Sequence, residues 1–234
     1  MAAPKIIQSF ILVGKRNRPG YKLNPKYITI HDTANTQAGA DAKAHAAYLK
    51  KNPPASEASW HFTVDDKVIY QHLPLNENGW HAGDGANGTG NRESIGIEIC
   101  ENRDGNRAKA EANAAWLVAK LLKDFSLGMD RVKQHYDWSK KNCPRVIRGR
   151  VNGWQDFLAA VEDYLKPALI PSAPPGPLPI ITKQIGIMVN GKLVNEVGYL
   201  INNATYVRAA YVIGLAGGQV TGHGDHIRIV VEKK

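Results

Sequence analysis

Three side chains in this sequence are of the types that bind zinc in enzymes. His31 ends a strand-like segment, His135 precedes Tyr136, and Cys143 lies eight residues after His135. Imidazole and thiolate are good zinc ligands, and a catalytic zinc keeps three protein ligands and one open position for water. Pro144 restricts the backbone directly after the cysteine. The set therefore indicates a candidate catalytic metal site.

The spacing of these residues does not by itself decide the interpretation. It matches neither a Cys-x-x-Cys nor a His-Glu-x-x-His pattern, which are specific local signatures of metal sites. Taken one at a time, His31 is more simply interpreted as a strand-end histidine and Cys143 as an ordinary thiol. Both interpretations stay open on the residues alone.

Two predicted strands carry polar side chains opposite an apolar face. Residues 27–31 place two isoleucines on one face and His31 on the other, because side chains alternate along a strand. Residues 94–100 place three isoleucines on one face and Glu98 on the other. If the isoleucines pack on the core, Glu98 belongs to the face where a cleft would lie.

The remaining periodicity alternates between strand and helix. Residues 60–64 and 68–71 predict a β-hairpin. Residues 41–51, 108–126 and 154–165 have the apolar spacing of helices. In the second helix the apolar positions at helical spacing are Ala112, Ala115, Trp116, Ala119 and Leu122. This order predicts an α/β fold, a mixed central sheet flanked by helices.

A proline-rich segment divides the chain. The protein has 234 residues, of which 43% are hydrophobic, which is enough to bury a core and excludes wholesale disorder. Six prolines fall within residues 167–179, so this segment is expected to be a semi-rigid extended linker. It separates a predicted catalytic domain, residues 1–166, from a small α+β domain, residues 180–234.

The small C-terminal domain has strand signals. Residues 187–194 predict two strands joined by an Asn-Gly turn. Residues 199–207 and 227–231 predict further strands around a helical segment at 209–215. This part resembles the small stalk-type domains at the ends of Gram-positive extracellular proteins, which predicts cell-wall binding. The alternative is a folding or dimerisation appendage.

Charge and cysteine usage narrow the classes of partner. The net charge of +9 predicts a polyanionic partner, such as nucleic acid, an acidic membrane surface or an anionic cell wall. No basic run is interleaved with aromatic residues, so we expect no nucleic-acid partner. No apolar stretch approaches the roughly 20 residues that span a bilayer. The two cysteines, Cys100 and Cys143, form no disulfide framework, and Cys100 is interpreted as a small core or cleft residue.

Several ordered motifs resemble the zinc amidases of the peptidoglycan-recognition and phage-endolysin family, especially the lysins of Bacillus phages and prophages. The resemblance covers roughly residues 1–165. The residues that carry it are 28–35, 59–66, 69–83, 94–102, His135 and 141–144. It implies an N-acetylmuramoyl-L-alanine amidase that cuts bacterial peptidoglycan with bound Zn²⁺.

The resemblance also implies roles for particular residues. The family's three zinc ligands fall on His31, His135 and Cys143. Glu98 is the candidate general base, since many active members have an acid in this strand; the alternative is a solvated carboxylate. Lys141 matches a lysine that stabilises the developing oxyanion, and the alternative is a solvated lysine.

Three residues are assigned to substrate binding. Trp60 stands where some relatives carry a cleft tyrosine, and His61 in the same motif is either a cleft residue or a partly buried structural histidine. His81 is expected to bind substrate, because nearby glycines leave the backbone free to meet a glycan. The glycine-rich segment 84–90 is interpreted as a flexible loop.

The resemblance leaves three function classes to separate. The first is a lysin that acts on the Gram-positive cell wall, expected to be monomeric. It would be made in the host cytoplasm without a signal peptide and act after release. The second is a recognition module that binds peptidoglycan without cutting it; such members typically lack the cysteine ligand. The third, a regulator that binds a host polymerase, has no discriminating feature in this sequence.

Overall fold

The structure is a computed structural model that describes residues 3–51 and 57–166, and five strands in the C-terminal part of the chain. The chain divides into two compact units, Met1–Ala168 and Leu169–Lys234. Each is described by itself. Helices of the described residues include none long and apolar enough to cross a membrane.

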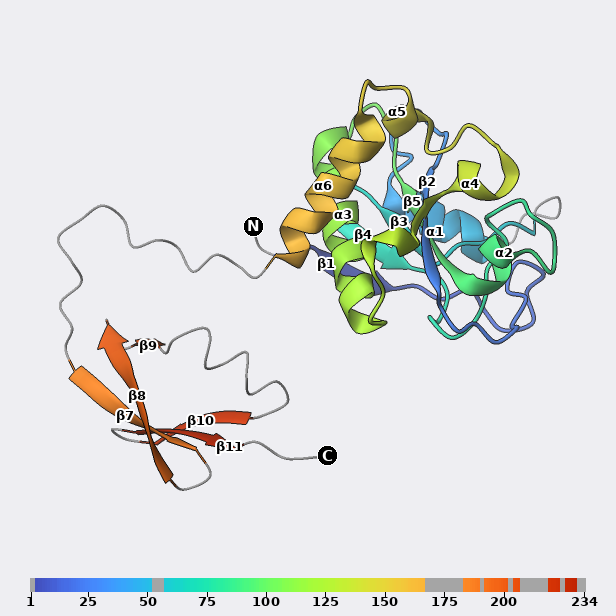
Figure 1. Ribbon diagram of the computed structural model, residues 1–234. Coiled ribbons are helices and arrows are strands. Elements are labelled where there is room, and N and C mark those ends of the chain that lie inside the picture. Colours follow the sequence, from blue (N-terminus) through green and yellow to red (C-terminus); the bar gives the residue numbers. More distant parts are fainter. Residues whose placement is uncertain are drawn as a thin grey trace. The chain divides into compact units, whose positions relative to one another are not determined.

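The first unit is built on a six-stranded sheet with the order β1-β4-β3-β5-β2-β6 (Figure 1). Only β3 and β4 pair antiparallel, and every other neighbouring pair is parallel. The strands are β1 (Lys5–Gln8), β2 (Tyr27–Asp32), β3 (Phe62–Val64), β4 (Val68–Gln71), β5 (Ser94–Ile99) and β6 (Val132–Gln134). The predicted mixed α/β fold and the β3–β4 hairpin are confirmed.

The register between β2 and β5 decides which side chains share a face. Ile28 pairs with Ile95 and Ile30 with Ile97, and all four side chains are fully buried in the main core. The same register places His31 directly opposite Glu98. Because side chains alternate along each strand, this pair projects from the face opposite the isoleucines.

Helices cover the two faces of the sheet. On the isoleucine face, α3 (Arg107–Asp124) and α6 (Gly153–Leu165) pack against each other (Figure 1). On the other face, α1 (Ala42–Lys51) lies against β3 and β4 and contributes to a second, small core. That core contains Ile11, Leu49, Trp60 and Leu73. The three predicted long helices are confirmed to within two residues at each end.

The buried face of α3 is wider than its predicted stripe. Ala112 and Trp116 are only half-buried, whereas Ala114, Leu117 and Leu121 are almost completely buried. The helix predicted from this spacing is confirmed, and Trp116 packs against the main core. Further positions are buried because α3 packs on the sheet and on α6 at once. A helix with two partners buries two adjoining stripes.

Short elements around the site were not predicted. They are β6, α2 (Thr89–Glu93), α4 (His135–Ser139) and α5 (Arg145–Arg148). The α2 helix begins inside the segment interpreted as a flexible loop. There the Asp84 carboxylate accepts hydrogen bonds from the backbone N–H groups of Gly90, at 2.6 Å, and Asn91, at 3.2 Å. These bonds order the segment.

The second unit contains a five-stranded sheet with the order β10-β11-β7-β8-β9. Its strands are β7 (Lys183–Val189), β8 (Lys192–Ile201), β9 (Ala204–Tyr206), β10 (Gln219–His223) and β11 (His226–Val230). The antiparallel β7–β8 pair confirms the predicted hairpin. The strand signal at 199–207 falls on the end of β8 and on β9, which pair antiparallel, and the signal at 227–231 falls on β11. The linker 167–179 and the predicted helix 209–215 lie outside the described residues.

Candidate metal centre and active site

The sheet brings three distant ligand candidates to one point. His31 lies in β2, His135 begins α4 directly after β6, and Cys143 precedes α5. Since β2 and β6 are parallel neighbours, their carboxyl ends share one edge of the sheet. One ligand atom from each of the three residues lies within 4.8 Å of the others, and all three residues are buried. His31 Nδ1 is 2.9 Å from His135 Nδ1 and 3.9 Å from Cys143 Sγ.

The donor set fits a zinc ion. Burial lowers the pKa of His31 well below its ordinary value, with nearby His81, His135 and Lys141 adding to the effect. Burial, with Lys141, lowers the pKa of His135 to about 4. Both rings are therefore neutral near pH 7, and neutral imidazole is the form that binds metals.

The thiol of Cys143 needs a cation to ionise. Burial, together with the neighbouring Glu98 and Asp32, raises its pKa to about 12. A coordinating thiol is deprotonated by the metal that it binds. Two neutral imidazoles and one thiolate make the three-ligand set of a catalytic zinc site.

Asp32 is a residue of this site to which sequence reasoning assigned no role. Its backbone N–H donates to Cys143 Sγ, at 3.3 Å. Its carboxylate accepts from the backbone N–H of Val146, at 2.7 Å, and from the Arg107 guanidinium, at 2.5 Å. Asp32 thus connects β2 to α3, to α5 and to Cys143. The only feature of the sequence that could have indicated this role is the position of Asp32 directly after the candidate ligand His31.

Glu98 lies beside the cluster. Its Oε1 is 4.0 Å from His31 Nδ1, and its side chain is 14% exposed. Among the residues that the structure describes, Oε2 is buried without a hydrogen-bond partner. Burial and the nearby Asp32 raise the pKa of Glu98 well above its ordinary value, while Lys141 opposes them. A cation at the cluster would lower that pKa again, because opposite charge favours the ionised form.

Lys141 is exposed and lies two residues before Cys143. Its positive charge lowers the pKa values of His31, Glu98 and His135. An exposed cation near a buried site can stabilise negative charge that develops on a substrate.

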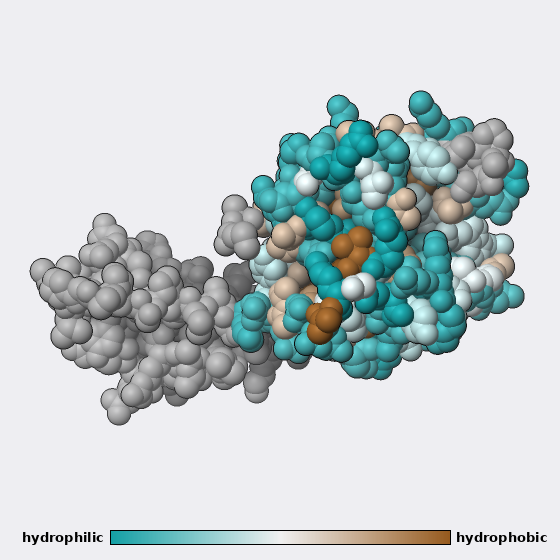
Figure 2. Space-filling model, turned by 90° about the horizontal axis from the view of Figure 1, so that it is seen from above, coloured by the Kyte–Doolittle hydropathy of each residue, from teal (hydrophilic) through white to brown (hydrophobic). Residues whose placement is uncertain are grey.

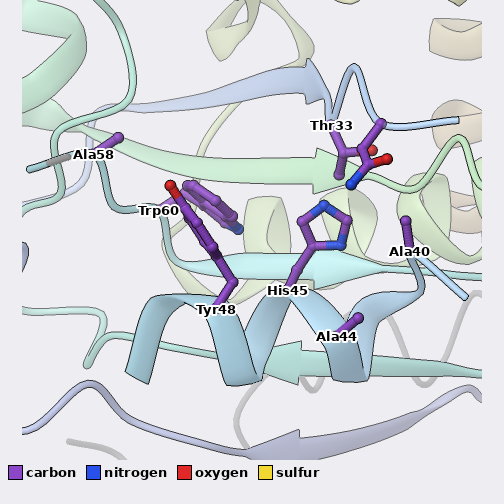
Figure 3. Close-up of a pocket in the computed structure, with 8 residues that line it drawn as sticks. Thr33, Ala40, Ala44, His45, Tyr48, Ala58 and Trp60 are labelled. Atoms are coloured by element: carbon purple, nitrogen blue, oxygen red, sulfur yellow. The ribbon is translucent and has the colours of Figure 1, made fainter. Parts of the chain in front are cut away.

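Trp60 lines a pocket between α1 and the segment that follows β2 (Figure 3). His45 and Tyr48 project from α1 toward it, and Thr33, two residues after His31, forms another wall. The indole Nε1 donates to Thr63 Oγ1, at 2.7 Å, which fixes the ring. The substrate-binding role of Trp60 stays a prediction that this position supports.

His61 and His81 lie deeper than expected. His61 is fully buried, and both ring nitrogens have backbone partners: Nδ1 accepts from Gly96 N–H, at 3.0 Å, and Nε2 bonds Glu77 O, at 2.9 Å. His81 is 8% exposed and lies behind His31. For His61 the structural alternative fits these contacts, and for His81 the placement in an open cleft is corrected. Strand packing turns these rings into the protein, and periodicity could not show this.

The sheet order and the buried histidine–cysteine cluster define an α/β domain with a candidate metal centre at one end of its sheet. The profile of the family described as N-acetylmuramoyl-L-alanine amidase matches residues 21–146. This match covers more than half of the chain. The chain belongs to the N-acetylmuramoyl-L-alanine amidase family of enzymes.

Known relatives agree with this assignment. N-acetylmuramoyl-L-alanine amidase CwlH of Bacillus subtilis (strain 168) is 56% identical over 74% of this chain and 67% of its own length. N-acetylmuramoyl-L-alanine amidase XlyA of the same strain is 60% identical over 67% of this chain, a match that spans half of its own length (50%). The solved catalytic domain of XlyA superposes with a TM-score of 0.63 at 59% identity. That superposition covers 67% of this chain and 99% of the domain.

Proposed function

We propose that this chain is a zinc-dependent amidase that hydrolyses the bond between N-acetylmuramic acid and L-alanine in peptidoglycan. The observation that carries the proposal is the buried meeting of His31, His135 and Cys143 beside the unpartnered carboxylate oxygen of Glu98. The activity in the names of CwlH and XlyA supports the choice of bond.

The chain's own residues have separate tasks in this reaction. His31, His135 and Cys143 hold the metal, which supplies Lewis-acid polarisation of the amide carbonyl and a more acidic water when bound. Glu98 accepts the proton of the attacking water and returns it to the leaving amine. Lys141 donates hydrogen bonds to the oxyanion that develops on the carbonyl oxygen.

Surface and pocket features suit a wall substrate. The pocket beside Trp60 has small apolar walls from Ala40 and Ala44 and is proposed to receive part of the substrate (Figure 3). The face of the first unit in Figure 2 is largely hydrophilic, with small, separate hydrophobic patches. With a net charge of +9, such a surface suits a polyanionic wall. We propose that the enzyme acts as a monomer after release from the cytoplasm in which it is made.

Metal removal tests the central claim. We expect one zinc per chain, loss of wall lysis with a strong chelator, and recovery when zinc is added back, because the three ligands position the catalytic ion. Metal analysis and turbidity of a wall suspension measure this. Full lysis by a metal-free preparation would rule out the mechanism.

A second candidate function is recognition of peptidoglycan without cleavage. Mass spectrometry of digested walls separates the two functions. Release of free stem peptides from intact glycan strands supports the amidase. Binding to walls with no released peptide would favour the recognition module.

Removal of the second unit tests its proposed role in wall binding. A chain that ends at Lys166 should fold and cut, because the first unit has its own core. It should bind intact walls more weakly, since a second binding site raises the effective concentration at the wall. Sedimentation with purified walls measures binding. Equal binding by the whole and shortened chains would favour a folding or dimerisation appendage.

A further inference from the structure

His81 connects a candidate ligand to the backbone of the sheet. His31 Nε2 lies 3.0 Å from His81 Nδ1. His81 Nε2 lies 3.3 Å from the carbonyl oxygen of Ser94. His31, His81 and the Ser94 carbonyl thus form a continuous series of hydrogen bonds from the ligand cluster to β5.

The Ser94 carbonyl determines which ring nitrogens of His81 and His31 carry a hydrogen. A carbonyl oxygen only accepts, so His81 Nε2 must carry the hydrogen. A neutral imidazole has one N–H, so His81 Nδ1 is unprotonated and accepts a hydrogen bond from the Nε2–H of His31. His31 Nδ1 is then also unprotonated and free to coordinate a metal. It lies 2.9 Å from His135 Nδ1 and 3.9 Å from Cys143 Sγ. His81 is 8% exposed, and among the described residues its hydrogen-bond partners His31, Asn91 and the Ser94 carbonyl include no carboxylate, so nothing in this buried position stabilises a charged ring.

The next residues of the same segment orient the second histidine ligand. The His135 ring is hydrogen-bonded to the backbone of Ala82. The Ala82 N–H already donates to Asn91 Oδ1, so the ring donates to the Ala82 carbonyl oxygen. A Cβ atom on Gly83 would lie 3.3 Å from His135 Nε2, so this nitrogen is the one turned toward the segment. His135 Nδ1 is left bare toward the cluster. Residues 81–83 therefore face both histidine ligands from behind.

This segment is held in place from two sides. Asn91 Oδ1 accepts from the backbone N–H groups of His81 and Ala82, both at 2.8 Å, and Asn91 is 4% exposed. The His81 ring lies against Gly96, where an added Cβ would come within 2.7 Å of His81 Cγ. Only a glycine at this strand position leaves room for the ring.

We propose that His81 is a positioning residue of the metal centre. It accepts the Nε2–H of His31 and so fixes the tautomer that offers Nδ1 to the metal, while residues 81–83 fix His135 in the same way. The inference rests on the proposed zinc site and replaces the substrate-binding role expected for His81. Outer-shell partners of this kind orient ligand rings and raise their basicity.

Two substitutions at position 81 separate hydrogen bonding from packing. Leucine and asparagine have the same branched shape, but only asparagine places an acceptor oxygen where His81 Nδ1 lies. We expect His81→Leu to weaken zinc affinity about 10- to 100-fold, the usual effect of losing an outer-shell partner. His81→Asn should retain most of the affinity. Competition with a chromophoric zinc chelator measures both.

A matched control removes another buried histidine. His72 is fully buried, and its Nε2 lies 2.8 Å from Thr63 Oγ1 and bonds none of the three ligand candidates. His72→Leu should lower stability and leave zinc affinity unchanged. If His81→Leu binds zinc as tightly as the unaltered chain, or if His81→Asn loses as much as His81→Leu, His81 is not a positioning residue.

The unaltered protein gives a test that needs no variant. Nitrogen-15 spectra of the zinc-loaded chain should show His31 coordinated through Nδ1 and protonated at Nε2. Coordination through Nε2 would overturn the inference even if both leucine variants fail to fold. An unaltered chain that binds no zinc would instead refute the proposed function, so the two failures are distinct.

Discussion

Glu98→Gln should retain zinc and lose about 10²- to 10⁴-fold in turnover, the usual contribution of a positioned proton acceptor. Glutamine keeps the shape of the side chain but cannot take a proton from water. Glu98 lies 4.0 Å from His31 and outside the three-ligand cluster, so the metal should stay bound. Muropeptide release per unit time, together with zinc content, measures the two effects separately.

Glu93→Gln is the matched control for this change. Glu93 lies just before the same strand and pairs with Lys26 on the surface, where ion pairs contribute about 0–1 kcal/mol. Its substitution should leave turnover unchanged. A Glu98→Gln enzyme that cuts at the unaltered rate would remove Glu98 from the mechanism, whereas loss of zinc from it would assign Glu98 to the metal site itself.

The zinc content and lytic rate of three Cys143 variants should follow an order that is expected only if Cys143 is a metal ligand. Cys143→Ala and Cys143→Ser should lose zinc and lytic rate together, because a methyl group cannot coordinate and a neutral hydroxyl is a poor ligand. The loss in affinity should exceed the roughly 10- to 100-fold cost of an outer-shell change. Cys143→Asp should retain more of both, since carboxylate oxygen binds zinc at about 2.0–2.2 Å, against about 2.3 Å for sulfur.

A buried cysteine without a ligand role predicts the reverse order. Alanine and serine would be tolerated in its place, and a buried aspartate would be worst because its charge lacks a partner. Cys100 provides this comparison within the same chain, since it is 3% exposed and lies outside the cluster. Cys100→Ala should keep zinc and activity. Zinc stoichiometry and lytic rate in one buffer decide between the two orders for Cys143.

Local sequence pattern determined the longer elements of the first unit, but not the short ones around the site. The alternation at β2 and β5, the hairpin β3–β4 and the three long helices were all predicted, because side-chain periodicity follows directly from backbone geometry. The same alternation placed Glu98 on the face opposite the isoleucines. The ligand candidates were also recognisable by residue type, although their roles came from the resemblance to a family.

Tertiary structure alone decided which of these residues meet. His31 lies 104 residues from His135 and 112 from Cys143, and only the parallel pairing of β2 with β6 brings them to one sheet edge. The sequence also did not show how deeply side chains are buried. It left His61 open between a cleft and a structural role and placed His81 in the cleft, whereas their hydrogen-bond partners are backbone groups and another ring. Side-chain period is a local property, whereas burial and hydrogen-bond partners depend on contacts between distant segments.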